Sequence, residues 1–228
     1  MRRIAGVIAD MHFTPTEQSR QNLLREGTPA DTVLNTGNTV VDAVLWAAQQ
    51  PFDLRTLPLE PALLDRLAAG DPALDLVLVT AHRRESFGEP FDNICRALRE
   101  LALAGRGRTQ IVYPVHLNPN VQEPVNRILR GTPNVHLLPP LEYLPLVHLM
   151  KRARLVLTDS GGIQEKAPGF GIPVLVMRER TERPEGVAAG TAKLVGTDQQ
   201  RIIAEARKLL ENSESYEQMA KEIGRAHV

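Results

Sequence analysis

The stretch LVLTDSGGIQEKAPGFGIPVLVM, residues 155–177, decides how the chain is expected to fold. Its apolar run 155–157 ends in Thr-Asp-Ser-Gly-Gly, a helix-like segment follows at 163–170, and a second apolar run starts at Val174, just after Pro173. A strand, a glycine turn, a helix and a strand in this order predict a β-α-β unit with both strands buried. Free backbone N–H groups at such a turn can meet an anion.

The same alternation continues on both sides of this unit. Near-continuous apolar strands separated by helices imply a parallel sheet that helices cover on both faces. We therefore predict a doubly wound, Rossmann-like α/β domain over residues 74–222, with ligand sites at the carboxyl ends of its strands. The predicted strands are 74–82, 109–116, 134–141, 155–157 and 174–177, with a short apolar piece at 192–196, and the predicted helices are 89–105, 120–131, 143–153, 163–170, 198–212 and 215–223.

Residues 1–40 are predicted to be a separate unit. Residues 4–14 fit a buried strand, and a helix follows with Thr16 as its cap and Gly27 as its stop. A single β-α unit cannot bury both of its faces, so it must pack on another part of the protein. Residues 41–73 are predicted to hold a crossover helix and a connector that contains one further short helix.

Composition and charge exclude several classes of protein. The 228 residues carry 27 Lys and Arg against 27 Asp and Glu, so neither a broadly basic nucleic-acid surface nor an acidic disordered tail is expected. The single cysteine, Cys95, excludes an internal disulfide, and no His or Cys spacing indicates a metal site. No stretch has the roughly 18 to 20 apolar residues that span a bilayer. We expect a cytoplasmic protein with no cofactor and no nucleic-acid or membrane partner.

Polar clusters follow three of the predicted strands. They are His82, Arg83, Arg84 and Glu85, then His116, and then Arg178, Arg183 and Glu185. An open α/β sheet offers its cleft at these strand ends, and cationic side chains there can bind a diphosphate or transfer a proton. Each cluster alone also fits a solvated charged loop. The glycine turn at 160–162 alone also fits a purely structural connection between a strand and a helix. The clusters together favour a ligand cleft.

Other histidines and acids are weaker candidates. Asp10 and His12 close the first predicted strand, where such residues usually belong to turns. His136 and His148 lie inside a strand and a helix pattern, where a structural imidazole is the commoner role. No Ser-His-Asp or Cys-His arrangement stands out.

Five segments in this order resemble the non-hydrolysing UDP-N-acetylglucosamine 2-epimerases: TAHRRESFG (80–88), PVHLNPNVQEPVNRIL (114–129), LTDSGGIQE (157–165), PVLVMR (173–178) and TERPEGVAAGT (181–191). The resemblance extends to IADMHFTPTEQSRQNLLREG (8–27) and NTGNTVVDAVLW (35–46), and so covers nearly all of the chain. It implies the C-terminal half of a GT-B-like fold, in which two Rossmann-like domains face each other across a cleft. Residues 1–40 then resemble the end of the first domain, and 74–222 the UDP-binding second domain.

The resemblance also implies the chemistry. This family interconverts UDP-N-acetylglucosamine and UDP-N-acetylmannosamine, and serves cell-surface polysaccharide biosynthesis. The C2 proton is removed and UDP is expelled to give a 2-acetamidoglucal, which takes UDP back with C2 inverted. That reaction needs acid/base groups at the sugar and a grip on the departing diphosphate. The family's acid/base carboxylates belong to the first domain, so residues 1–228 alone are expected to be inactive. A homodimer is expected from the family.

Individual site residues follow from the same resemblance. His82 matches the active-site histidine, Arg183 matches an arginine at the nucleotide, and the diphosphate-binding turn matches Ser160, Gly161 and Gly162. Arg83 and His116 match positions that contact a second, activating UDP-N-acetylglucosamine in bacterial members.

Lys166 departs from the family pattern Ser-Gly-Gly-x-Gln-Glu-Glu-Ala, in which the second Glu accepts hydrogen bonds from the ribose hydroxyls. Lysine offers no acceptor and reverses the charge. Losing a charged hydrogen-bond partner costs about 1.5 to 3 kcal/mol. We expect UDP to bind this chain more weakly than it binds the family, and Lys166→Glu to tighten it.

The C-terminal sequence departs as well. Ile-Gly-Arg-Ala-His-Val, residues 223–228, is what a common sequencing adapter would encode, so it is expected to be a non-native tail. Two alternative functions remain open. One is a GT-B-type UDP-sugar transferase or the hydrolysing relative that releases free N-acetylmannosamine. The other is a standalone UDP-sugar-binding or regulatory half that pairs with a separate polypeptide.

Overall fold

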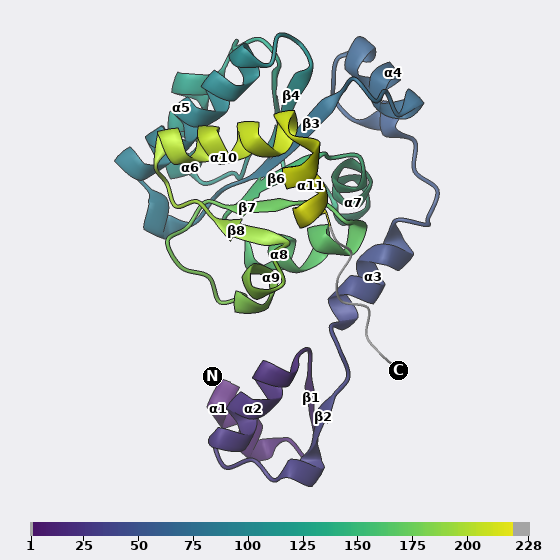
Figure 1. Ribbon diagram of the computed structural model, residues 1–228, viewed down its shortest axis with the longest axis vertical. Helices are drawn as coiled ribbons and strands as arrows, with labels where there is room; N and C mark the ends of the chain where they lie inside the picture. The colour runs from purple at the N-terminus through teal and green to yellow at the C-terminus, as the bar shows by residue number, and fades with distance from the viewer. Residues whose placement is uncertain (1, 221–228) are drawn as a thin grey trace.

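All strands of the main sheet run parallel, in the order β5-β4-β3-β6-β7-β8 (Figure 1). The structure is a computed structural model that describes residues 2–220. The chain moves outward from β3 to β5 on one side and from β6 to β8 on the other, so the topological switch lies between β3 and β6. The strands are β3 (Asp75–Thr80), β4 (Thr109–Pro114), β5 (Val135–Leu138), β6 (Leu155–Thr158), β7 (Val174–Val176) and β8 (Ala192–Leu194).

Both faces of this sheet are buried because successive strand side chains point to opposite sides. Val77 and Val79 of β3 pack into one apolar cluster, whereas Leu76 and Leu78 pack into the other. The first cluster is covered by α5 (Glu89–Ala104), α6 (Pro119–Leu129) and α10 (Gln199–Glu211). The second is covered by α4 (Pro61–Ala69), α7 (Tyr143–Lys151), α8 (Gly161–Lys166) and the 3-10 helix η4 (Ala167–Phe170). The predicted doubly wound α/β class is confirmed.

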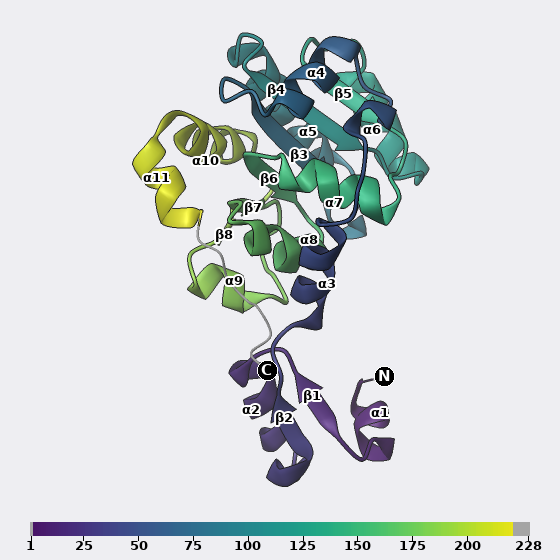
Figure 2. The same ribbon diagram turned by 90° about the vertical axis from the view of Figure 1, so that its right-hand side faces the viewer.

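The N-terminal residues form a small unit that stands apart from the main domain (Figure 2). It holds α1 (Arg2–Ile8), β1 (His12–Thr14), α2 (Glu17–Arg25), η1 (Ala30–Thr32) and β2 (Val33–Asn35), and β1 pairs with β2 in parallel. The predicted strand 4–14 is wrong over its first half. Ile4, Val7 and Ile8 have the i, i+3, i+4 spacing of one helix face, and no alternation supports a strand there.

Helix α3 (Thr39–Ala47) connects this unit to the main domain. Val44 and Ala47 are buried against Val147 of α7, and Nζ of Lys151 donates a hydrogen bond to the carbonyl of Ala48 at 3.3 Å. The connector that follows contains η2 (Leu54–Thr56) and α4. Its leucines join the second apolar cluster, so the crossover is packed onto the sheet rather than loose.

Three segments differ from the sequence-based expectation. The predicted helix 163–170 is divided into α8 and η4, because Pro168 has no N–H to continue the α-helical ladder. The charged loop 178–186 runs into a short helix, α9 (Pro184–Ala188), which begins with proline at its first position. The last described helix is α11 (Ser213–Met219), and the proposed tail 223–228 lies outside the described residues.

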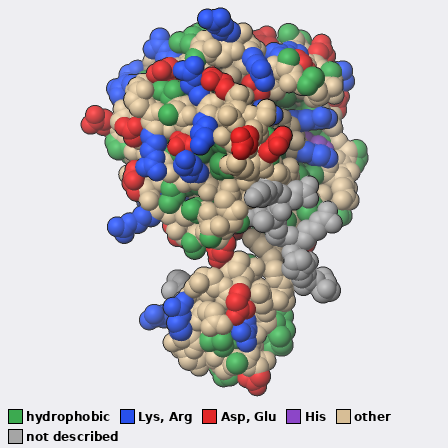
Figure 3. Space-filling view, in the orientation of Figure 1, with side chains coloured by type: hydrophobic (Ala, Val, Ile, Leu, Met, Phe, Trp, Pro, Cys, Tyr) green, Lys and Arg blue, Asp and Glu red, His purple; other side chains and the backbone are tan. Residues whose placement is uncertain are grey.

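The surface carries mixed charge. On the face shown in Figure 3, Lys and Arg side chains alternate with Asp and Glu over the main domain. In the described part of the chain, no helix has the length and apolar content that crossing a membrane requires.

Candidate functional site

The predicted polar residues gather at the topological switch of the sheet. β3 leads into His82 and into η3 (Arg84–Ser86), and β6 leads into Asp159 and Ser160. These strands are neighbours, so their carboxyl ends lie side by side at the position where open α/β sheets bind ligands. The position between the two strand ends, around His82, Arg83, Asp159 and Ser160, is called the crevice below.

Asp159 is the hub of this crevice, and the sequence did not single it out. Its side chain is fully buried, and Oδ2 accepts hydrogen bonds from the backbone N–H groups of His82 and Arg83, both at 2.7 Å. Nδ1 of His82 lies 3.6 Å from Oδ1 of Asp159. Burial raises the pKa of the Asp159 carboxyl above its ordinary value, although the two backbone hydrogen bonds favour the ionised form. An acidic residue between a buried strand and a Ser-Gly-Gly turn was the available signal.

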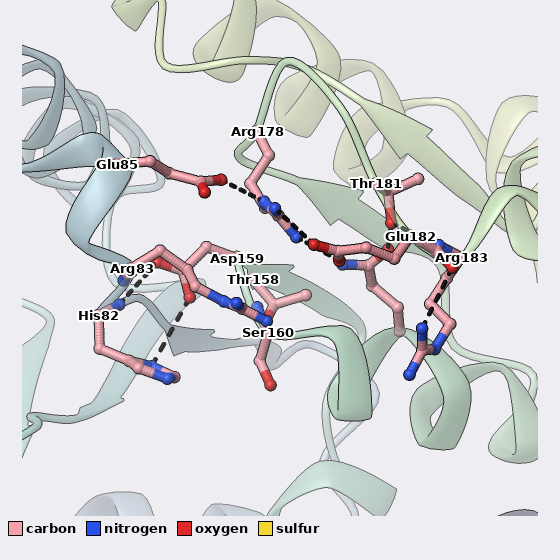
Figure 4. A network of polar contacts seen from close by, with 11 residues as sticks. His82, Arg83, Glu85, Thr158, Asp159, Ser160, Arg178, Thr181, Glu182 and Arg183 are labelled. Atoms are coloured by element: carbon pink, nitrogen blue, oxygen red, sulfur yellow. Dashed lines mark hydrogen bonds and ion pairs between the residues drawn. The ribbon is translucent and has the colours of Figure 1, made fainter. Parts of the chain in front are cut away.

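The structure also brings His116 to this point. The imidazole rings of His82 and His116 stack with their centroids 5.2 Å apart and their planes 11° apart. His116 therefore covers one face of the ring whose edge approaches Asp159. Figure 4 shows the Arg83 side chain extending past Asp159 toward Ser160.

The turn at Ser160 is fixed by threonines. The N–H of Ser160 donates to Oγ1 of Thr158 at 2.9 Å, and the hydroxyls of Thr158 and Thr80 are hydrogen-bonded at 2.6 Å. Helix α8 starts immediately afterwards with Gly161 and Gly162, and Ser160 makes no side-chain cap. The first N–H groups of a helix have no partner within it, so the glycine amides can bind an anion that approaches the turn.

Both glycines are approached by cations. A Cβ placed on Gly161 would lie 3.9 Å from Nη2 of Arg83, and a Cβ placed on Gly162 would lie 4.0 Å from Nζ of Lys166. The ammonium of Lys166 also lies 5.1 Å from the ring centroid of Tyr143. The turn therefore has positive charge on two sides.

Arg178 connects two of the strand-end loops. Its side chain is buried, with 7% exposed, and its Nε donates to Glu85 at 2.5 Å while Nη1 and Nη2 donate to the carboxylate of Glu182 at 2.8 and 3.1 Å. Hydrogen bonds from Arg178 lower the pKa of Glu182 to about 2. The same pair raises the pKa of Arg178. Arg178 thus fastens η3 to the loop after β7 (Figure 4).

Arg183 lies further along that loop, away from His82. Its Nε makes a short contact with Oε1 of Glu165, and its N–H donates to Oγ1 of Thr181 at 3.0 Å. Thr181 in turn donates to Oε1 of Gln164 at 2.6 Å. The loop is therefore attached to α8, but Arg183 does not join the cluster around Asp159.

A cavity of about 490 Å³ lies between the N-terminal unit and the main domain. Arg183, Glu165 and Glu185 line it from the main domain, and Thr16 and Asn38 are among the residues that line it from the other side. Oγ1 of Thr16 donates to Oε1 of Glu185 at 3.0 Å across the junction. His82, Asp159 and Ser160 are not part of this lining, so the cavity and the site around Asp159 are separate.

Two further histidines, His136 and His148, pack within the main domain. Nε2 of His136 is hydrogen-bonded to Gln110 at 2.8 Å, and burial lowers the pKa of His136. His148 stacks on Phe52 with centroids 5.2 Å apart. Among residues 2–220, no group of His, Cys, Asp or Glu side chains is placed to hold a metal ion.

A doubly wound sheet with a polar crevice at its topological switch defines an α/β protein of the Rossmann-like class. Residues 1–225 match the protein family described as UDP-N-acetylglucosamine 2-epimerase. The chain belongs to this family.

Curated relatives agree with that match. The UDP-N-acetylglucosamine 2-epimerase of Salmonella typhimurium is 54% identical over 224 residues, which cover 96% of this chain and 58% of the relative. The protein of the same name from Escherichia coli (strain K12) has the same identity and coverage. The chain therefore spans about 58% of the length of these relatives.

Solved structures are similar too. The UDP-GlcNAc 2-epimerase from Neisseria meningitidis bound to UDP-GlcNAc is 45% identical, with a TM-score of 0.83 over 96% of this chain and 58% of that one. The S. aureus MnaA-UDP co-structure is 39% identical, with a TM-score of 0.84 over 97% and 57% of the two chains. The Methanocaldococcus jannaschii UDP-GlcNAc 2-epimerase in complex with UDP-GlcNAc and UDP is 29% identical, with a TM-score of 0.72 over 96% and 57%.

Proposed function

We propose that this chain supplies the UDP-binding part of a UDP-N-acetylglucosamine 2-epimerase, which interconverts UDP-N-acetylglucosamine and UDP-N-acetylmannosamine. The observation that carries the proposal is the crevice at the β3–β6 switch, where Asp159 holds His82 beside the Ser160 turn. The relatives with solved structures bind UDP-GlcNAc or UDP, which supports the choice of ligand.

Each residue has a proposed role. The amides of Gly161 and Gly162 bind the diphosphate, and Arg183 contacts the same nucleotide. His82 lies at the bond between sugar and diphosphate, where it stabilises the leaving UDP. The elimination removes the proton from C2 and breaks the bond from C1 to the diphosphate oxygen. Re-addition of UDP with protonation from the other face of C2 completes the epimerisation.

A second nucleotide-sugar site is part of the proposal. Arg83 and His116 are proposed to contact an activating UDP-N-acetylglucosamine, and both lie within the same crevice as His82. The stacked imidazoles would carry the effect of the second ligand to the first, because movement of His116 exposes or covers a face of His82. The proposed domains are 1–40, the 41–73 crossover and the 74–222 UDP-binding domain, and the enzyme is proposed to be a cytoplasmic homodimer.

A chimaera tests this function. The part of the Escherichia coli relative that lies outside the matched region is joined to this chain, and UDP-N-acetylglucosamine is supplied. The expected product is UDP-N-acetylmannosamine with UDP still attached, and His82→Asn should abolish its formation. His136→Asn is the matched control, because His136 bonds to Gln110 within the sheet. Free N-acetylmannosamine would instead identify a hydrolysing enzyme, and transfer of the sugar to another acceptor would identify a transferase.

A further inference from the structure

The ammonium of Lys166 lies beside the glycine turn. Helical side chains lean toward the N-terminal end of their helix, so a residue at the end of α8 reaches back over the residue four positions earlier. Here that residue is Gly162, whose missing Cβ leaves space 4.0 Å from Nζ. Lys166 is only partly exposed, and its ammonium lies over the ring of Tyr143.

The charge of Lys166 has no counter-ion among residues 2–220. Within residues 2–220 no carboxylate lies within ion-pair distance of Nζ, and the neighbouring carboxylate of Glu165 pairs with Arg183 instead. The only interaction of the ammonium in that range is with the Tyr143 ring, 5.1 Å away. A cation close to the first turn of a helix is unfavourable because the helix dipole is positive there. An anion at the turn would remove that repulsion.

Arg83 approaches the same turn from the other side. Its Nη2 lies 3.9 Å from the Cβ position of Gly161, and its guanidinium also forms no ion pair within the described chain. Asp159 and Glu182 influence Arg83 at longer range, but their oxygens bond to the His82 loop and to Arg178. The turn thus has a cation on each side, and neither cation forms an ion pair among residues 2–220.

We propose that Lys166 is a specificity-determining residue that binds the phosphates of the nucleotide. The inference rests on the proposed function and refines it. A carboxylate at this position would serve ribose hydroxyls, whereas an ammonium beside Gly162 serves phosphate oxygens. Compared with a chain that has Glu at this position, this chain therefore makes fewer contacts to the ribose and more to the diphosphate. Lys166→Glu has two opposite effects on UDP: the carboxylate gains hydrogen bonds to the ribose, and the contact to the phosphates is lost. Uridine has no phosphates, so its affinity reports the ribose contacts alone.

The test separates the two parts of the nucleotide. Uridine and UDP are each titrated into the polypeptide of residues 1–228 and followed by NMR. The dissociation constant of uridine divided by that of UDP measures how much the phosphates contribute to binding. Lys166→Met should lower this ratio by about tenfold, because a charge-assisted contact is lost. Lys166→Arg should keep the ratio within about threefold, since the cation remains. Lys166→Glu should tighten uridine and lower the ratio.

Lys208→Met is the matched control. Lys208 is an exposed lysine on α10, whose helix packs against α5, so its loss changes the net charge without touching the turn. If Lys166→Met leaves the ratio within about twofold of the unmodified chain while UDP still binds more tightly than uridine, Lys166 does not contact phosphate and the inference is wrong. If the unmodified chain binds UDP no better than uridine, the proposed function fails together with the inference.

Discussion

Asp159 approaches both the backbone and the ring of His82 across the topological switch of the sheet. Oδ2 of Asp159 accepts the backbone N–H of His82 at 2.7 Å, and Oδ1 lies 3.6 Å from Nδ1 of the imidazole. One buried carboxylate therefore holds the loop by two backbone hydrogen bonds, and its other oxygen lies close to the ring without a hydrogen bond of its own among residues 2–220. Because Asp159 directly precedes Ser160, the same residue sets the distance between the histidine and the glycine turn.

Removing the Asp159 carboxylate should destabilise the protein, because the backbone N–H groups that donate to it lose their partner. Asp159→Ala leaves the partly buried N–H groups of His82 and Arg83 without their acceptor, which should cost about 1 to 3 kcal/mol each. Asp159→Asn keeps an acceptor oxygen and should stay within about 1 kcal/mol of the unmodified chain. Urea denaturation at neutral pH measures both. Equal stability of the Ala and Asn variants would contradict the assigned role.

The raised pKa of Asp159 predicts how stability depends on pH. A carboxyl whose folded pKa exceeds its unfolded value binds its proton more tightly in the folded state. Its contribution to stability is therefore lost as the pH rises from the ordinary value of 3.8 through the higher folded pKa. Asp159→Asn cannot titrate and should lack this loss. The prediction fails if the free energy of unfolding of both proteins changes in parallel between pH 4 and pH 7.

Arg178→Lys should cost about 1 to 2 kcal/mol of stability although it keeps the charge. The arginine fork is buried and reaches both Glu85 and Glu182, and one ammonium cannot reproduce that geometry. Arg207→Lys is the control, since the Arg207–Glu211 pair lies on the surface of α10 and should contribute at most about 0.5 kcal/mol. Thermal denaturation compares the two variants. Equal shifts in Tm would show that Arg178 does not stabilise the protein through its bonds to Glu85 and Glu182.

Glu182 gives the opposite pH dependence. Its folded pKa of about 2 lies below the ordinary value of 4.5, so its stabilisation is complete above pH 4.5 and is lost as the pH falls toward 2. Because the side chain is 58% exposed, solvent screening limits this stabilisation to about 1 kcal/mol. Glu182→Gln should be less stable than the unmodified chain at pH 6 and equal to it near pH 2. A constant difference at both pH values would show that the ion pair is not responsible.

The Thr16–Glu185 hydrogen bond connects the N-terminal unit to the main domain. Thr16 also caps α2, because its Oγ1 accepts the N–H of Ser19 at 3.1 Å. Thr16→Ala should remove both interactions, with about 1 kcal/mol lost from the cap, whereas Glu185→Ala should remove only the contact across the junction. Hydrogen exchange in α2 should therefore rise strongly in Thr16→Ala and little in Glu185→Ala. Equal exchange in both variants would exclude the separate roles.

The sheet could be predicted from sequence because burial on both faces leaves continuous apolar runs. Residues 74–80 and 155–158 show no other periodicity, and both became central strands. The start of the chain was harder, since a short run of apolar residues fits either a strand or a helix. Only the spacing of Ile4, Val7 and Ile8 distinguishes the two, and no buried surface enforces it, because all three side chains are exposed.

The candidate site was predictable in position but not in its connections. Polar residues after strands indicate a crevice whatever their partners are, and His82, Arg83 and Ser160 could be found in this way. The bonds from Asp159 to the His82 loop and from Arg178 to Glu85 join positions far apart in sequence. Those pairs follow from strand order, which local sequence does not encode.

The most direct test of the central claim is an NMR titration of ¹⁵N-labelled residues 1–228 with UDP. If the crevice at the β3–β6 switch binds the diphosphate, the amide signals of Ser160, Gly161 and Gly162 should shift together and saturate at the same UDP concentration as those of His82 and Arg83. Signals that remain unchanged at the turn while UDP binds elsewhere, or no saturable shift at all, would contradict the account.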